Sequence, residues 1–195
     1  MNDTIEQVIA VIRENRRKFK DFCFSLSEDQ LSLRVPDSAW IAKDFASHLD
    51  TLDTTFVEFI GVVERGGNID MARDSNGAPF DLDAWNDAQV AERREWSIAR
   101  IFAEAAANRT QLIEALSRLT EEQISRPMHF TDPKRGAADF PLKAFLVGWA
   151  QHDPIHAADM LKALPELVSD AGIATWLANP FVSGYQASMS GAVKP

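Results

Sequence analysis

The feature that most constrains the fold of this chain is a set of long segments whose apolar residues recur at steps of three and four. These segments cover residues 4–26, 42–64, 83–119 and 141–164. Such spacing places the apolar side chains on one face of an α-helix. Alternating β-branched runs, the sign of a half-buried strand, are almost absent. We therefore predict an all-α protein, a four-helix bundle with short extra helices and a C-terminal tail.

Capping residues and length predict where these helices begin and end. Three segments begin with a capping-box pattern, a Ser or Thr followed three residues later by Gln: Thr4/Gln7, Ser27/Gln30 and Thr120/Gln123. A straight helix over residues 83–119 would reach roughly 55 Å, too long for a domain of this size. We expect an interruption before Trp96. The polar stretch from Asn68 to Asp81 reads as a loop.

The length of the chain favours one folded unit. Its 195 residues, 46% of them hydrophobic, are enough for one domain with a well-filled core. We assign residues 1–165 to the bundle and 166–195 to the tail. The aromatic residues of the tail, Trp176, Phe181 and Tyr185, need an apolar surface. They have two places to pack: their own bundle, or a neighbouring subunit in a homodimer.

Charge and cysteine content argue against several classes of partner. The chain has 29 acidic and 20 basic residues, a net charge of −9, which disfavours nucleic acid and an anionic membrane surface as partners. The N-terminus is polar and acidic, unlike a signal peptide, and no apolar run is long enough to span a membrane. We expect a soluble cytoplasmic protein. Cys23, the lone cysteine, lies in an apolar helical run and is expected to be a buried thiol.

Two histidines are the residues of this sequence that most clearly suggest a chemical function. His152 and His156 are four residues apart and share a helical stripe with Phe145 and Trp149. Imidazoles on consecutive turns can bind one metal ion. The spacing alone is equally compatible with two core histidines that hydrogen-bond to neighbours.

Pro154 lies between the two histidines and has to be accommodated. Inside a helix it removes the hydrogen bond to the Ala150 carbonyl. One solution ends a helix near Gln151 and starts another with Asp153 as N-cap, which would turn His152 away from His156. The other is a single helix kinked at Pro154, which frees a carbonyl. We favour the kink, because the apolar stripe continues in phase on both sides.

A third histidine on another helix completes a possible ligand set. His48 shares the apolar stripe of its helix with Leu52, Thr55 and Phe59. Inward positions of different helices meet at the centre of a bundle, where such folds build metal sites. His48, His152 and His156 would give three nitrogen ligands and leave a coordination position open. His129, in the stretch MHFTDPKRG, is interpreted as a surface or loop residue.

The sequence resembles a known family at these positions. The run from Trp40 through Lys43 and Asp44 to His48 and Leu49 resembles the W-x-x-K-D-x-x-x-H-L opening of the second helix in the DinB-like superfamily of metal-binding four-helix bundles. Trp85-Asn86 resembles the start of its third helix, and His152-Asp-Pro-Ile-His156 its H-x-x-x-H. The resemblance covers roughly residues 1 to 165 and departs from the family at Ile41, often a Ser or Thr N-cap, and at Pro154.

This resemblance implies a divalent metal ion, commonly zinc, nickel or iron, bound by His48, His152 and His156. Members of the family include thiol-dependent transferases, maleylpyruvate-isomerase-type proteins that use low-molecular-weight thiols, and proteins described as metal-dependent hydrolases. The implied function is activation of a water or thiol for transfer to, or hydrolysis of, a small electrophile. The implied cosubstrate is a low-molecular-weight thiol.

Three carboxylates near the histidines are acid/base or positioning candidates: Asp44, Asp53 and Asp159. We rank Asp159 first, because it lies three residues after His156 and nearest the ligand stripe. The alternative to an enzyme is a non-catalytic metal-binding or interaction bundle in which the ion only stiffens the core. A third reading is a helical domain with packed histidines and no metal.

Overall fold

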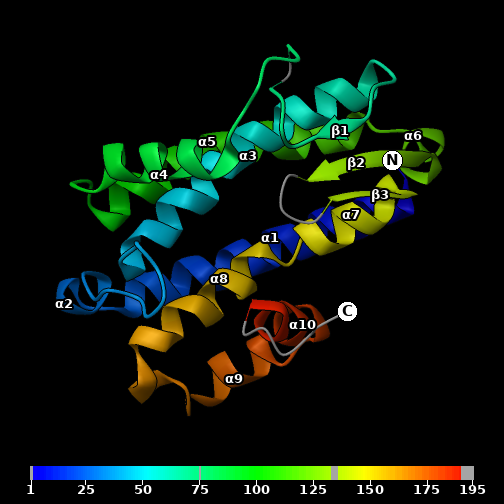
Figure 1. Cartoon of the computed structure of the whole chain (residues 1–195). Helices are drawn as coiled ribbons and strands as arrows, with labels where there is room; N and C mark the ends of the chain where they lie inside the picture. Colours follow the sequence, from blue (N-terminus) through cyan, green and yellow to red (C-terminus); the bar gives the residue numbers. More distant parts are fainter. Residues whose placement is uncertain (1, 75, 133–135, 190–195) are drawn as a thin grey trace.

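The protein is described by a computed structural model that places residues 2–74, 76–132 and 136–189. It is built mainly of helices (Figure 1). The longer ones are α1 (Asp3–Ser25), α3 (Ala42–Glu64), α4 (Leu82–Arg93), α5 (Ile98–Arg118), α7 (Leu142–Trp149), α8 (His152–Met160) and α10 (Pro180–Met189). The shorter ones are α2 (Glu28–Leu31), α6 (Glu121–Ser125), α9 (Ala171–Leu177) and the 3₁₀ turns η1 (Leu161–Ala163) and η2 (Pro165–Leu167).

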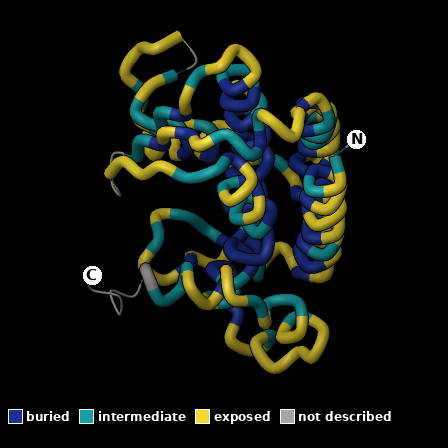
Figure 2. Tube along the Cα trace, turned by 90° about the vertical axis from the view of Figure 1, so that its right-hand side faces the viewer, coloured by how far each residue is buried: buried dark blue, intermediate teal, exposed yellow. Residues whose placement is uncertain are grey.

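Four helical rods form the bundle: α1, α3, α5 and the consecutive pair α7 and α8. Helix α3 packs along α5, and α1 contacts α5, α7 and α8. Buried residues line the inner faces of these rods and exposed residues face outward (Figure 2). The largest fully buried side chains include Phe19 on α1, Phe56 on α3 and Leu116 on α5. The predicted four-helix bundle is confirmed, and Cys23 is buried in it as expected.

The helix ends follow the predicted capping chemistry at two of three places. Ser27 with Gln30, and Thr120 with Gln123, form reciprocal capping boxes at the starts of α2 and α6. The prediction for Thr4 was wrong, because the N-cap of α1 is Asn2, two residues earlier, whose side chain accepts a hydrogen bond from the Thr4 N–H. The expected interruption before Trp96 is present, since α4 ends at Arg93 and Ser97 caps α5.

A small sheet covers one end of the bundle. It contains β1 (Ile69–Asp70), β2 (Pro127–Asp132) and β3 (Gly136–Pro141), with β1 parallel and β3 antiparallel to β2. These strands were not predicted from the sequence, where 68–81 was expected to be a loop. Alternation is confined to β2, where Met128 and Phe130 are buried and His129 between them is exposed, while β3 has no β-branched residue. Phe130 stacks on Phe140 and Phe145, which fastens the sheet to α7.

The favoured kink at Pro154 was wrong, because the chain breaks into two helices. Helix α7 ends at Trp149, and Gln151 leaves helical geometry with φ −101° and ψ 7° before α8 begins at His152. Pro154 is therefore the third residue of α8, where the helix needs no N–H donor from it. The break differs from the alternative weighed above, in which Asp153 was the N-cap. It leaves His152 inside α8, facing the same way as His156.

The described part of the tail packs on α8 (Figure 1). Asn179, just before α10, donates a 2.9 Å hydrogen bond to Gln151, and Trp176 of α9 donates one of 3.1 Å to Asn15 of α1. Val182 is buried. Within the described residues, no helix combines the length and apolar character needed to cross a membrane.

Candidate metal centre

Three imidazole rings from two helices meet inside the bundle. The ring of His48, from α3, lies edge to face against that of His156, from α8, with centroids 4.9 Å apart. The ring of His152, also from α8, lies 5.7 Å from that of His156. His48 and His156 are buried and His152 is half-buried. The structure thus brings together the three histidines that the sequence singled out.

Aromatic side chains surround these rings. Trp40 lies 4.8 Å from His48, Phe45 lies 5.5 Å from His156, and Trp149 lies 4.3 Å from His152, all between ring centroids. Trp149 also stacks on Phe56 at 4.0 Å. The stripe predicted from Phe145 to His156 therefore persists across the helix break. These rings exclude water from the histidines on several sides and strengthen electrostatic interactions there.

The environment of His48 favours its neutral form. Burial, together with the neighbouring His156 and His152, lowers the pKa of His48 well below its usual range, and Asn86 of α4 acts weakly in the opposite direction. Its Nδ1 atom is buried without a hydrogen-bond partner. A buried imidazole nitrogen with no partner is costly unless something binds it. A neutral imidazole is also the form that a metal ion binds.

The three imidazole rings lie close together without forming a ready-made metal site. In the described part of the chain, no group of three or more His, Cys, Asp or Glu side chains is placed to hold a metal ion. The ring separations and donor chemistry nevertheless suit a divalent ion, and imidazoles rotate about a broad χ2 torsion. The residues therefore fit such an ion in chemistry and proximity, provided that the rings turn to aim their nitrogens.

Asp159 lies directly beside one of these histidines. Its Oδ2 is 3.1 Å from Nδ1 of His156, while its Oδ1 accepts hydrogen bonds from Lys162 at 2.7 Å and Gln186 at 3.1 Å. Burial alone would raise the pKa of Asp159, but its bonds with His156 and Lys162 hold this pKa below the usual range. An ionised carboxylate on Nδ1 leaves Nε2 as the nitrogen available for a ligand.

Asp53 lies in a buried network of charges contributed by four helices. It is 2.8 Å from Arg109 of α5 and 3.8 Å from Arg16 of α1. Arg16 and Arg109 also pair with Asp153 of α8, at 2.9 Å and 3.6 Å. Arg16, Arg109 and Asp153 were not predicted from the sequence to lie near the candidate site. Arg16 follows the apolar stripe of its helix at Ile12, and this charged residue at an inward position was the available signal.

The network and the histidines share a small cavity. It measures about 10 Å³, and His152, Asp53, Arg109 and Asp153 contribute to its wall. That volume holds roughly one water molecule. The structure thus places Asp53 near His152 across this cavity.

The other two sequence candidates lie away from the rings. Asp44 accepts hydrogen bonds from the Ile41 N–H at 3.1 Å and from Arg94 at 2.8 Å, so it caps α3 where a Ser or Thr is missing. His129 lies on the exposed side of β2, and its Nδ1 is 2.8 Å from Asp139. Asp44 therefore serves as a helix cap, and His129 is a surface residue as interpreted from the sequence.

The fold and the histidine cluster define a helical bundle with buried imidazoles at its centre. A sequence profile of the DinB superfamily matches residues 12–160, and the chain belongs to this superfamily. Comparison with curated proteins finds no match.

Solved structures show the same fold. YfiT from Bacillus subtilis, described as a probable metal-dependent hydrolase with an unusual four-helix bundle topology, is 17% identical with a TM-score of 0.62, over 88% of this chain and 90% of its own. A mycothiol-dependent maleylpyruvate isomerase is 12% identical with a TM-score of 0.60. This match covers 82% of the present chain, which spans only 63% of the isomerase.

Proposed function

We propose that this protein is an enzyme that depends on a divalent metal ion, zinc, nickel or iron, held by His48, His152 and His156. The reaction is transfer of a thiol to, or hydrolysis of, a small electrophile. The observation that carries the proposal is that the rings of His48 and His152 both lie near the His156 ring, at 4.9 and 5.7 Å between centroids, in a buried aromatic setting. A structural neighbour described as metal-dependent and another described as mycothiol-dependent support it.

The chemistry divides between the ion and the chain. When bound, the ion would supply a Lewis acid that makes a water or thiol nucleophilic near pH 7. Asp159 holds Nδ1 of His156, which keeps Nε2 directed away from the carboxylate. Trp40 and Trp149 shield the imidazoles from bulk water. Asp53, across the small cavity from His152, is proposed as a proton acceptor for a water held there.

A second candidate function is a non-catalytic metal-binding bundle. The observation that favours it is the size of the cavity beside His152, about 10 Å³, which admits a water molecule but no larger substrate. An enzyme of the proposed kind needs the aromatic rings, or the tail on α8, to move and admit its substrate. A bound ion that exchanges no water with solvent would decide for the non-catalytic function.

Elemental analysis combined with an activity assay tests the proposal. The wild-type protein is expected to carry about one metal ion per chain and to consume a thiol with a small electrophile, both abolished by a chelator. His152→Ala should lose the ion and the activity, whereas His129→Ala, on the exposed face of β2, should keep both. A wild-type protein that never binds a stoichiometric ion would refute the proposal.

The proposal also covers the cellular location and the oligomeric state of the protein. We place the protein in the cytoplasm with a small-molecule substrate and no nucleic-acid partner, in keeping with its net charge of −9. A homodimer formed through the tail stays a prediction. Light scattering on the purified protein tests it.

A further inference from the structure

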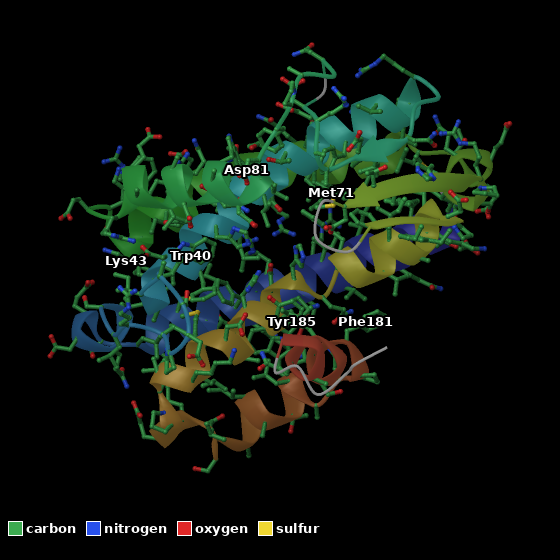
Figure 3. The ribbon with its side chains drawn as sticks, viewed as in Figure 1. Trp40, Lys43, Met71, Asp81, Phe181 and Tyr185 are labelled. Atoms are coloured by element: carbon green, nitrogen blue, oxygen red, sulfur yellow. The ribbon has the colours of Figure 1, made fainter. Side chains whose placement is uncertain are left out.

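Helix α10 reaches the histidine cluster although it lies beyond the residues matched by the superfamily. The match ends at residue 160 and α10 covers Pro180–Met189. Figure 3 shows Tyr185 on the side of α10 that faces α8, where its ring lies 6.4 Å from that of His156 at an angle of 79°. The next residue, Gln186, donates a 3.1 Å hydrogen bond to Oδ1 of Asp159.

This hydrogen bond extends a chain of contacts to a proposed metal ligand. Oδ2 of the same carboxylate lies 3.1 Å from Nδ1 of His156. The two oxygens of a carboxylate share one plane, so donors that fix Oδ1 also fix the direction in which Oδ2 points. Oδ1 has two donors, Gln186 and Lys162, and the Lys162 side chain is 37% exposed. A long ammonium side chain at the surface is flexible. Gln186 therefore restrains the Asp159 carboxylate more than Lys162 does.

We propose that Gln186 is a positioning residue, which sets the orientation of the His156 imidazole through Asp159. The proposal rests on the proposed function in treating His156 as a metal ligand. The tail then contributes to the geometry of the metal centre in this chain. Partners that orient a ligating histidine typically change metal affinity 10–100-fold when removed. Gln186 acts one contact further out, so we expect a loss of about fivefold.

Other contacts dock the tail without Gln186. Trp176 bonds to Asn15, Asn179 bonds to Gln151, and Val182 is 5% exposed. Removing the Gln186 amide should therefore leave α10 in place. Gln186→Met is the appropriate variant, because methionine keeps the chain length and helix propensity of glutamine and lacks the donor.

Cobalt(II) alone is the probe for the first measurement, as a titration of the whole metal-free protein followed by absorbance. Gln186→Met is expected to weaken binding about fivefold and to change the cobalt spectrum. Trp176→Phe, which removes a different hydrogen bond between the tail and the bundle, should match the wild type. Asp159→Asn should shift affinity and spectrum in the same direction as Gln186→Met and further. Wild-type affinity and spectrum in Gln186→Met would overturn the inference.

A second measurement uses no metal. The ¹⁵N shifts of His156 in the metal-free protein report which ring nitrogen carries the proton, and the wild type is expected to hold it on Nδ1 beside Asp159. Gln186→Met should move these shifts toward a mixture of tautomers, and Trp176→Phe should not. Unchanged shifts would refute the role of Gln186. If the wild type binds no cobalt, the proposed function fails, and these shifts alone decide whether Gln186 orients His156.

Discussion

The side-chain amide of Asn15 donates a 2.7 Å hydrogen bond to the main-chain carbonyl of Ala150. Ala150 is the C-cap of α7, so its carbonyl is one of the last of that helix and has no N–H donor further along it. The break between α7 and α8 therefore leaves one buried acceptor without its helical donor, and α1 supplies the replacement. Asn15 also accepts a hydrogen bond from Trp176, so the same side chain links the break to the tail.

We predict that Asn15→Leu destabilises the protein by about 1–3 kcal/mol, because it leaves a buried carbonyl unsatisfied. Urea unfolding followed by circular dichroism measures the change. Asn15 also bonds to Trp176, so Trp176→Phe, which removes only that second hydrogen bond, is the control and should cost less. Equal costs for the two variants would show that the bond to the Ala150 carbonyl contributes little.

A buried ion pair fastens α8 to α1. The Arg16 side chain is 2.9 Å from Asp153, and the two side chains are 12% and 5% exposed. Burial raises the pKa of Asp153, but Arg16 and Arg109 outweigh it and hold this pKa below its usual range. The carboxylate therefore depends on its two guanidinium partners.

We predict that Arg16→Met lowers the free energy of unfolding by roughly 3–5 kcal/mol, because it removes the main partner of the buried Asp153 carboxylate. The neighbouring residue supplies the control. Arg17 makes pairs with Glu14 and Asp21, but its side chain is 59% exposed, so Arg17→Met should cost far less than Arg16→Met. Unfolding curves of the two variants make the comparison. Similar losses would mean that the Arg16 network contributes no more than a surface pair.

The sequence predicted the bundle and the histidine cluster because both depend on periodicity. Inward positions at steps of three and four meet at the centre, so His48 and His156 could be paired before the structure was known. The break at Pro154 was not predictable in the same way, since the donor that compensates it, Asn15, is far away in the sequence. The role of Gln186 also depends on how the tail folds back, which no local pattern encodes.

Metal binding should be visible as thermal stabilisation. A ligand at 100 times its dissociation constant stabilises the folded state by about 2.7 kcal/mol, or roughly 5–10 °C in Tm for a chain of this size. We predict such a rise with zinc and its reversal by a chelator. His48→Ala and His156→Ala should abolish the rise, and His129→Ala should preserve it. A rise that survives in His48→Ala would place the zinc elsewhere.

Asp53 should make the stability depend on pH in the direction opposite to most carboxylates. Burial raises the pKa of Asp53 to about 6, and Arg109 and Arg16 only partly offset this effect, while Asp153 and Asp50 add to it. The folded state then binds this proton more tightly than the unfolded state does. The resulting stabilisation is full below about pH 4 and is lost as the pH rises through about 6.

Replacing Asp53 by Asn removes that dependence. The stability of Asp53→Asn relative to wild type should increase by about 2 kcal/mol between pH 4 and pH 7. Urea unfolding at unit intervals of pH measures the difference. Asp153→Asn is the contrast, because a lowered pKa gives stability that is lost only as the pH falls below about 4. Because Asp153 also raises the pKa of Asp53, Asp153→Asn should in addition move the Asp53 transition to lower pH. Parallel curves for wild type and Asp53→Asn over the whole range would show that Asp53 stays ionised in its buried network.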